Sequence, residues 1–413
     1  MKKILALMLA LMMMLFSVSA LAGTQTVTVN ATVNKDMLTS VAPMLGMQLD
    51  NSAQAVISLI NALTIKIVAS DNAGELDLDL RDGQHLIAIG GAMADNGLVI
   101  GSDLFPSYLF TISQEYLGQM MQQFMSQLPG GGQNIDMEAI ANRFYGYIGK
   151  FSMTFQTAVT PGTAETGSFE FEGFTFDTKT PMNVDVKALA EAEKTLVSDI
   201  LHDEFVGEML KTSGQNVDVE QIIQQNNQYM SEEYLPDVTV DVYTSTANAD
   251  IFYVESLATY KGQTDPAYRF TMLNMGDGEG TVKFYVLEQG ITISVIYGQN
   301  GFLLEIEGNG AYMGLKMTVN GSGALIEVFF MDKTNAVVTL EISVAQGGTF
   351  LVNTDQAGKT VIPIEDLQNN TVDQTVQQGF MQELQTNGMP LIMKLMTAVP
   401  EAATLIQGAM SGM

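Results

Sequence analysis

The stretch AYMGLKMTVNGSGALIEVFF, residues 311–330, decides the fold of this chain. Apolar residues occupy alternate positions on both sides of the turn sequence Asn320-Gly321-Ser322-Gly323. Alternate side chains of a β-strand point to the same face, so each run has one continuous apolar face. Two such runs joined by an Asn-Gly turn predict a β-hairpin.

The same pattern extends over residues 237–352. Turn sequences rich in Gly and Asn divide this part of the chain into a meander of about ten strands. Short loops join neighbouring strands, so the sheet is expected to be antiparallel. Its wide apolar face requires a cover. Helices expected near 186–233 and 366–412, a ligand, or both would supply that cover.

The side chains selected as a candidate apolar ligand face come from this sheet and from the last helices. They are Phe284, Ile293, Leu304, Met313, Leu315, Met317, Ile326, Val328, Met393 and Met396. Methionine is abundant, with 28 residues in the chain, and its flexible thioether adapts to irregular or exchangeable partners. Methionine also fills ordinary cores, so this alternative remains open.

The N-terminal part mixes both kinds of element. Strands are expected at 24–33, 64–70, 75–80, 85–92, 98–101 and 108–112, and helices at 36–47, 52–63, 113–127 and 135–148. Further on, a bulge at Gly173 would bring Phe169, Phe171, Phe174 and Phe176 onto one strand face. The chain is expected to close with helices at 366–386, 390–398 and 401–412.

The fold class expected from these elements is α+β: a large curved antiparallel meander with helices packed on its apolar face. A stretch of small residues near 157–167 suggests a boundary between an N-terminal α+β lobe at 23–160 and a sheet lobe at 161–413. Residues 110–117 and 361–367 both end a strand and enter a helix. This faint repeat suggests two lobes of similar plan.

Residues 1–22 are predicted to be an export signal. Two lysines precede an unbroken apolar stretch from Ile4 to Phe16, and small residues lead up to a cleavage point after Ala22. The chain has no cysteine, so its body would be held together by burial rather than by disulfides. These features favour a bacterial protein that is secreted, or periplasmic in a Gram-negative source.

The composition excludes several partners. A net charge of −28 repels nucleic acid and anionic membrane surfaces. The lack of cysteine removes thiolate metal sites and Cys nucleophiles. No stretch after residue 22 has the length and apolarity of a membrane span. We therefore expect no nucleic-acid partner, no integral membrane segment in the mature chain and no cofactor, and the sequence leaves the oligomeric state open.

No catalytic constellation is visible in the sequence. Neither His85 nor His202 belongs to a zinc or triad motif, and no nucleophile elbow or phosphate-binding loop occurs. Both histidines are expected to be ordinary surface or edge residues. Asp77 and Asp79 alternate with leucines, so they are expected on the solvent side of a half-buried strand, with adventitious calcium binding as the alternative. These observations favour a protein that is not an enzyme.

A long antiparallel meander closed by helices, in an exported chain, resembles the LolA-like superfamily of lipoprotein and lipid carriers. The resemblance is one of architecture, covers at best residues 165–413, and involves no shared motif, so no functional residue is carried over. It implies a curved half-barrel around an apolar cavity for acyl chains. We expect a non-enzymatic binding or carrier protein for an apolar, lipid-like ligand. The alternatives are a structural or surface-interaction protein with a self-filled core and, third, an unrecognised hydrolase.

Overall fold

A computed structural model of the chain describes residues 23–46, 48–95, 97–119, 146–147, 149, 153–154, 156–203, 206, 218–369 and 371–403. The expected export signal lies outside these residues, as do residues 120–127 of the helix expected at 113–127 and most of the helices expected at 135–148 and 401–412. The chain forms two compact units, here called unit 1 (residues 1–120 and 313–413) and unit 2 (residues 121–312). Each combines a sheet with helices, which confirms the α+β class.

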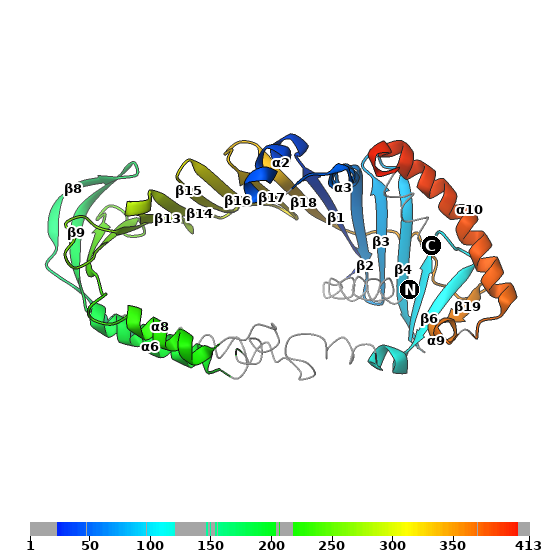
Figure 1. The fold of residues 1–413 in the computed structure, drawn as a ribbon, viewed down its shortest axis with the longest axis horizontal. Helices are drawn as coiled ribbons and strands as arrows, with labels where there is room; N and C mark the ends of the chain where they lie inside the picture. Colours follow the sequence, from blue (N-terminus) through cyan, green and yellow to red (C-terminus); the bar gives the residue numbers. More distant parts are fainter. Residues whose placement is uncertain are drawn as a thin grey trace. The chain divides into compact units, whose positions relative to one another are not determined.

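Unit 1 is built on a mostly antiparallel sheet. Its strands are β1 (Gln25–Val33), β2 (Leu63–Ala69), β3 (Ala73–Leu80), β4 (His85–Ala94), β5 (Gly97–Ser102), β6 (Tyr108–Ser113), β16 (Ala311–Asn320, in unit 1 from residue 313 on), β17 (Gly323–Phe330), β18 (Ala336–Gln346) and β19 (Thr360–Pro363). They lie in the order β16-β17-β18-β1-β2-β3-β4-β5-β6-β19 (Figure 1). Because β1 pairs with β18, strands from both ends of the chain share one unit. The compact units therefore differ from the lobes expected at 23–160 and 161–413.

The stretch 311–330 forms the predicted hairpin of β16 and β17. Leu315 lies opposite Val328, and Lys316 lies opposite Glu327. Apolar and polar residues thus occupy different faces, as alternation requires. Gly321 in the turn has a φ of 56°, the left-handed conformation that two-residue hairpin turns need and that glycine adopts readily.

Besides the helical residues 114–119 that follow β6, the described helices of unit 1 are α2 (Lys35–Val41), η1 (Ala42–Leu45), α3 (Asn51–Ala62), α9 (Ile364–Gln368), α10 (Gln374–Ala398) and η3 (Pro400–Ala402). The Asn61 side chain fastens α3 to β1, because it accepts from the Val33 amide (2.7 Å) and donates to the Val33 carbonyl (2.8 Å). Helix α10 lies beside β4 and β6 (Figure 1).

The expected break before Pro390 is wrong, because α10 continues through this residue. Polar contacts hold the helix on both sides of the proline. The Asn387 side chain donates to the Leu104 carbonyl at 2.9 Å, and the Lys394 ammonium donates to the His85 carbonyl at 3.0 Å. These tertiary contacts offset the main-chain hydrogen bond that proline cannot make.

The faint repeat has a different meaning from the one expected. β6 and β19 are parallel neighbours, with Phe110 beside Ile362, and each strand leads into a helix. Ile364 at the start of α9 packs with Ile100 and Ile112 in the core of unit 1. The two similar stretches therefore lie next to each other in one unit and do not mark two lobes of one plan.

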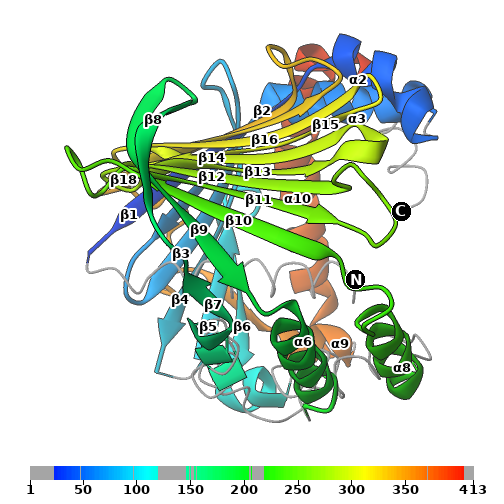
Figure 2. The same cartoon turned by 90° about the vertical axis from the view of Figure 1, so that its left-hand side faces the viewer.

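Unit 2 is built on an antiparallel sheet. Its strands are β7 (Val159–Pro161), β8 (Glu165–Phe171), β9 (Phe174–Val184), β10 (Asp237–Thr244), β11 (Phe252–Thr259), β12 (Tyr268–Gly276), β13 (Glu279–Val286), β14 (Ile291–Gly298) and β15 (Gly301–Gly308). Strands β9 to β15 follow one another in sequence order, and β7 and β8 both pair with β9 (Figure 2). Helices α6 (Val186–Leu201) and α8 (Val219–Tyr229) contact each other, and the Asp218 side chain caps the start of α8.

The four phenylalanines near Gly173 do share one face, but through a hairpin rather than through the expected bulge. Phe171 at the end of β8 lies opposite Phe174 at the start of β9. The two residues between them, Glu172 and Gly173, have φ angles of 50° and 86°, as in a two-residue turn with two left-handed residues. The rings pack with Tyr243 and other residues in the core of unit 2.

Gly97 offers a test of the tight turn into β5. Its φ is 133°, and a Cβ there would collide with the Ile112 carbonyl. We expect Gly97→Ala to lower the free energy of unfolding of unit 1 by about 3 kcal/mol, because a strained backbone and a clash act together.

Gly83→Ala is the matched control. Gly83 has a φ of 89°, but no atom lies within 4 Å of the position of the added Cβ. Its cost should be limited to the left-handed backbone, about 1 kcal/mol. Denaturant unfolding of both variants measures the difference, and equal costs would contradict the packing of β5 against β6.

Candidate functional site

The part of the candidate ligand face that belongs to unit 2 comes together on one side of its sheet. Phe284 lies opposite Ile293, which in turn lies opposite Ile306. Leu304 occupies the same face two residues before Ile306. This face is open to solvent in part, since Phe284 is 38% and Ile306 39% exposed.

The part in unit 1 lies on the apolar side of the β16–β17 hairpin. Met317 lies opposite Ile326, next to the pair of Leu315 and Val328, and Met313 continues the row. Met313 is 49% and Val328 38% exposed. The sequence therefore predicted correctly which hairpin side chains lie together.

The two methionines of α10 occupy a different environment. Met393 is exposed and lines an open cleft of about 480 Å³ with Leu80 and Gln84 at the β3–β4 turn. The principal strand contact of α10 is β4. Met393 thus lies at the β3–β4 turn, and Met396 follows it on the same helix, so α10 meets the sheet away from the strands that carry the other unit 1 candidates.

The opposite, polar side of β3 holds a cluster that sequence reasoning missed. Glu75, Asp77 and Asp79 are only 0%, 4% and 5% exposed. The expectation that Asp77 and Asp79 face solvent is wrong, because both side chains are buried. Residues 347–359, between β18 and β19, cross this side of the sheet at Glu75, Gly90 and Gly101. We call this segment the strap.

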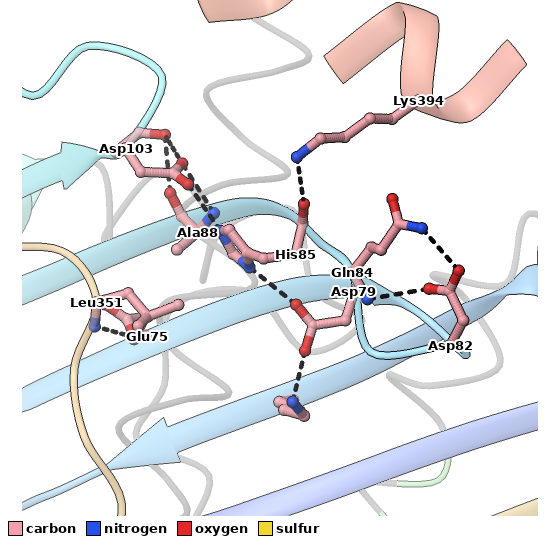
Figure 3. Close-up of polar contacts among 11 residues, drawn as sticks. Glu75, Asp79, Asp82, Gln84, His85, Ala88, Asp103, Leu351 and Lys394 are labelled. Carbon is pink, nitrogen blue, oxygen red and sulfur yellow. Dashed lines mark hydrogen bonds and ion pairs between the residues drawn. The ribbon is translucent and has the colours of Figure 1, made fainter. Parts of the chain in front are cut away.

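Glu75 fixes the strap through its carboxylate. Its Oε1 accepts from the Leu351 amide at 2.7 Å, and its Oε2 accepts from the Val352 amide at 2.6 Å (Figure 3). The Val352 side chain lies over two glycines, since a Cβ on Gly90 or Gly101 would come within 2.9 Å of it. The strap is thus held by hydrogen bonds to a charged carboxylate and by packing of Val352 against two glycines that leave room for it.

His85 lies between two carboxylates at the edge of this cluster. Its Nδ1 is 2.8 Å from Asp79 Oδ1, and its Nε2 is 2.7 Å from Asp103 Oδ2 (Figure 3). Burial alone would lower the pKa of His85, but the hydrogen bonds to Asp79 and Asp103 outweigh burial and raise it. Because both neighbours accept, the doubly protonated imidazolium fits this position best.

Asp79 has two cationic partners, His85 and the Lys66 ammonium. Burial would raise the pKa of the Asp79 carboxyl, but hydrogen bonds from Lys66 and His85 lower it. Asp77 has the opposite environment. Its Oδ1 is buried without a hydrogen-bond partner among the described residues, and burial followed by the charge of Glu75 raises its pKa to about 7.

The cluster can hold protons and main-chain amides. In the residues placed by the structure, no group of three or more acidic or histidine side chains converges on a point where a metal ion would fit. His85 has carboxylates on both ring nitrogens, so neither nitrogen activates a hydroxyl nucleophile. The sequence showed the acidic alternation in β3. It could not show the strap or Asp103, which reach the cluster from elsewhere in the chain.

The comparisons with known proteins add no family. A scan against protein-family models and searches of curated proteins and of solved structures found no match. The likeness to LolA-like carriers thus stays a resemblance of predicted architecture. Among the helices that the structure describes, none combines the length and the apolarity needed to cross a membrane.

The position of His85 predicts a measurable titration. Asp103→Asn removes one of its two carboxylates, so the raised pKa of His85 should fall toward its ordinary value. A raised folded-state pKa stabilises the protein fully below the unfolded value, and this stabilisation disappears as pH rises through the folded value. The variant should therefore lose stability at acidic pH more than at alkaline pH.

NMR of the imidazole signals measures this pKa, with His202→Gln used to assign the two histidines. Asp82→Asn is the control, because Asp82 contacts Gln84 in the adjacent turn and not the imidazole. An unchanged His85 titration in Asp103→Asn would contradict the arrangement.

Proposed function

We propose that this protein is a non-enzymatic binding protein for an apolar, lipid-like ligand, with the apolar sheet face of each unit as a separate surface for such a ligand. The observation that carries the proposal is the in-register row of exposed apolar side chains in each unit. In unit 2, Phe284 and Ile306 stay more than a third exposed, and in unit 1 Met313 and Val328 do the same. Contiguous apolar surface of this kind marks binding sites in soluble proteins.

The surface in unit 2 extends into an aromatic platform. Tyr268 stacks on Phe284 with ring centroids 5.6 Å apart and an interplanar angle of 19°. Tyr260 meets Tyr268 edge to face at 6.0 Å. Aromatic rings offer large, rigid contact area, and each methylene removed from water contributes about 0.8 kcal/mol. An acyl chain that crosses β13 to β15 would meet these rings and the isoleucine row.

Charge favours a single ligand molecule over docking to a bilayer. The chain carries a net charge of −28, which opposes close approach to an anionic membrane surface. The proposal agrees with the carrier function that the LolA-like resemblance implies. The proposal differs from that resemblance in what covers the apolar face. The side chains named above are exposed, so the ligand itself would shield them from water.

Two isoleucines of unit 2 provide a matched test. Ile306 and Ile296 are each 39% exposed. Ile306 lies opposite Ile293 on the apolar face, whereas Ile296 belongs to the other face of β14. We expect Ile306→Asp to weaken binding of a fluorescent long-chain fatty acid at least about tenfold, or about 1.4 kcal/mol.

Ile296→Asp should leave the dissociation constant nearly unchanged, because its side chain points away from the ligand face. Fluorescence titration of both variants gives the two constants. Equal weakening by both substitutions, or no saturable binding by the unmodified protein, would refute the proposal.

The second test uses protein as purified from its source. Native mass spectrometry before and after organic extraction should show a lipid-sized adduct that extraction removes. A protein partner on the same surface would instead give a second polypeptide. A bare chain in both spectra, together with no uptake of added fatty acid, would exclude the carrier function.

A further inference from the structure

The strap is fastened to unit 1 at both ends and in the middle. At its start, the Gly347 amide donates to the Thr24 carbonyl at 2.7 Å, and just beyond its end the Thr360 amide donates to Ser107 at 2.9 Å. Between these points, Glu75 accepts both the Leu351 and the Val352 amides. In the middle of the strap, both of these main-chain amides bind the same carboxylate.

The cationic side chains near Asp77 form their ion pairs with Asp79. On its own strand, Glu75 and Asp79 flank it on the same face. Lys66 on β2 and His85 on β4 both bond to Asp79, and Asp103 holds the other side of His85.

The nearest strap ammonium, Lys359, donates to the Asn353 carbonyl within the strap. Lys66 lies directly opposite Asp77 on β2, but its ammonium bonds to Asp79. Among the described residues, Asp77 Oδ1 has no hydrogen-bond partner. An ionised Asp77 would therefore meet Glu75 across a buried face with no cation hydrogen-bonded to it.

We propose that the strap is a pH-dependent latch, held on the sheet while Asp77 carries a proton and loosened when Asp77 ionises beside Glu75. Two adjacent buried carboxylates cannot both keep their charge without water or a cation. Lifting the strap admits that water, because Leu351 and Val352 lie directly over Glu75. The proposal is independent of the lipid-like ligand, which would lie on the opposite side of the sheet.

The direction of the switch follows from the carboxyl environment. Burial and the charge of Glu75 raise the pKa of Asp77 to about 7 from an ordinary value of 3.8. A folded state that holds this proton more tightly than the unfolded chain is stabilised in acid, and the stabilisation falls as pH rises from the unfolded value to the folded one. The latch is thus closed in acid and loosens through neutral pH.

Opening would enlarge a cleft that the strap already borders. This cleft has a volume of about 350 Å³ and lies between Gly90 and Gly91 on β4 and residues 350–354 of the strap. Movement of the Val352 side chain away from Gly90 and Gly101 would join the cleft to the buried carboxylates. The switch therefore controls access to the polar side of unit 1.

Hydrogen–deuterium exchange of the full chain tests the latch. Exchange of the Leu351 and Val352 amides is measured at about pH 5.5 and about pH 8.5 and corrected for the intrinsic pH dependence of exchange. We expect their protection to fall at least about tenfold at the higher pH. Amides of β11 in unit 2 should keep theirs and serve as the internal control.

Two variants separate the latch from general loosening. Asp77→Asn keeps the shape of the side chain without its charge, so strap protection should stay high at both pH values. Glu75→Gln retains one acceptor oxygen for two amides, so protection should be low at both. The proposal would be overturned if strap protection in the unmodified protein did not change with pH. It would also be overturned if strap protection in Asp77→Asn fell as much as in the unmodified protein. The first outcome needs no variant, so a variant that fails to fold does not remove the test.

Discussion

The pairing of β1 with β18 is the constraint on which unit 1 depends. Val29 in β1 lies opposite Ile342 in β18 on one side and Ile65 in β2 on the other. Because side chains alternate with a period of two, a slip of one residue here would exchange the two faces of the sheet. This register brings the N-terminal strands and the hairpin of β16 and β17 into one surface with one apolar side.

The other side of the same sheet shows what a buried polar face requires. Burial of charge is costly unless each charge is paired or hydrogen-bonded. Asp79 meets this condition through Lys66 and His85, and Glu75 meets it through two strap amides. Asp77 lacks such partners on Oδ1 among the described residues, and burial together with the charge of Glu75 raises its pKa. In the β16–β17 hairpin, Met313 and Val328 on the apolar side are exposed, whereas Tyr312 and Phe329 on the opposite side are buried. In most half-buried sheets the apolar side is the buried one.

Local patterns in the sequence predicted the local structure well. Alternation and turn residues predicted most strands of both units, and the Asn-Gly turn predicted the β16–β17 hairpin. Expectations that depended on distant parts of the chain were less successful. Glu75 is bound by strap amides more than two hundred residues away in the sequence. The continuity of α10 through Pro390 comes from contacts with β4 and the β5–β6 loop.

For the candidate ligand face, too, predictions from local patterns were better than those that depend on tertiary structure. Side chains on adjacent strands were grouped correctly because strand register follows from short turns. Met393 was assigned to this group from composition, and composition does not determine where a helix packs. The carboxylate cluster was visible only as an alternation in β3, since Asp103 and the strap are joined to it by tertiary structure.

Labelling of single cysteines tests most directly whether the apolar side is an open surface that a lipid-like ligand closes. The chain has no cysteine of its own, so Val328→Cys and Lys316→Cys each introduce one thiol, on the apolar and the polar side of the same hairpin. Val328→Cys should react readily with a maleimide and be protected at least about tenfold by saturating long-chain fatty acid, whereas Lys316→Cys should react at the same rate with and without it. Slow labelling of Val328→Cys without ligand, or equal rates with and without fatty acid, would contradict the proposed ligand surface.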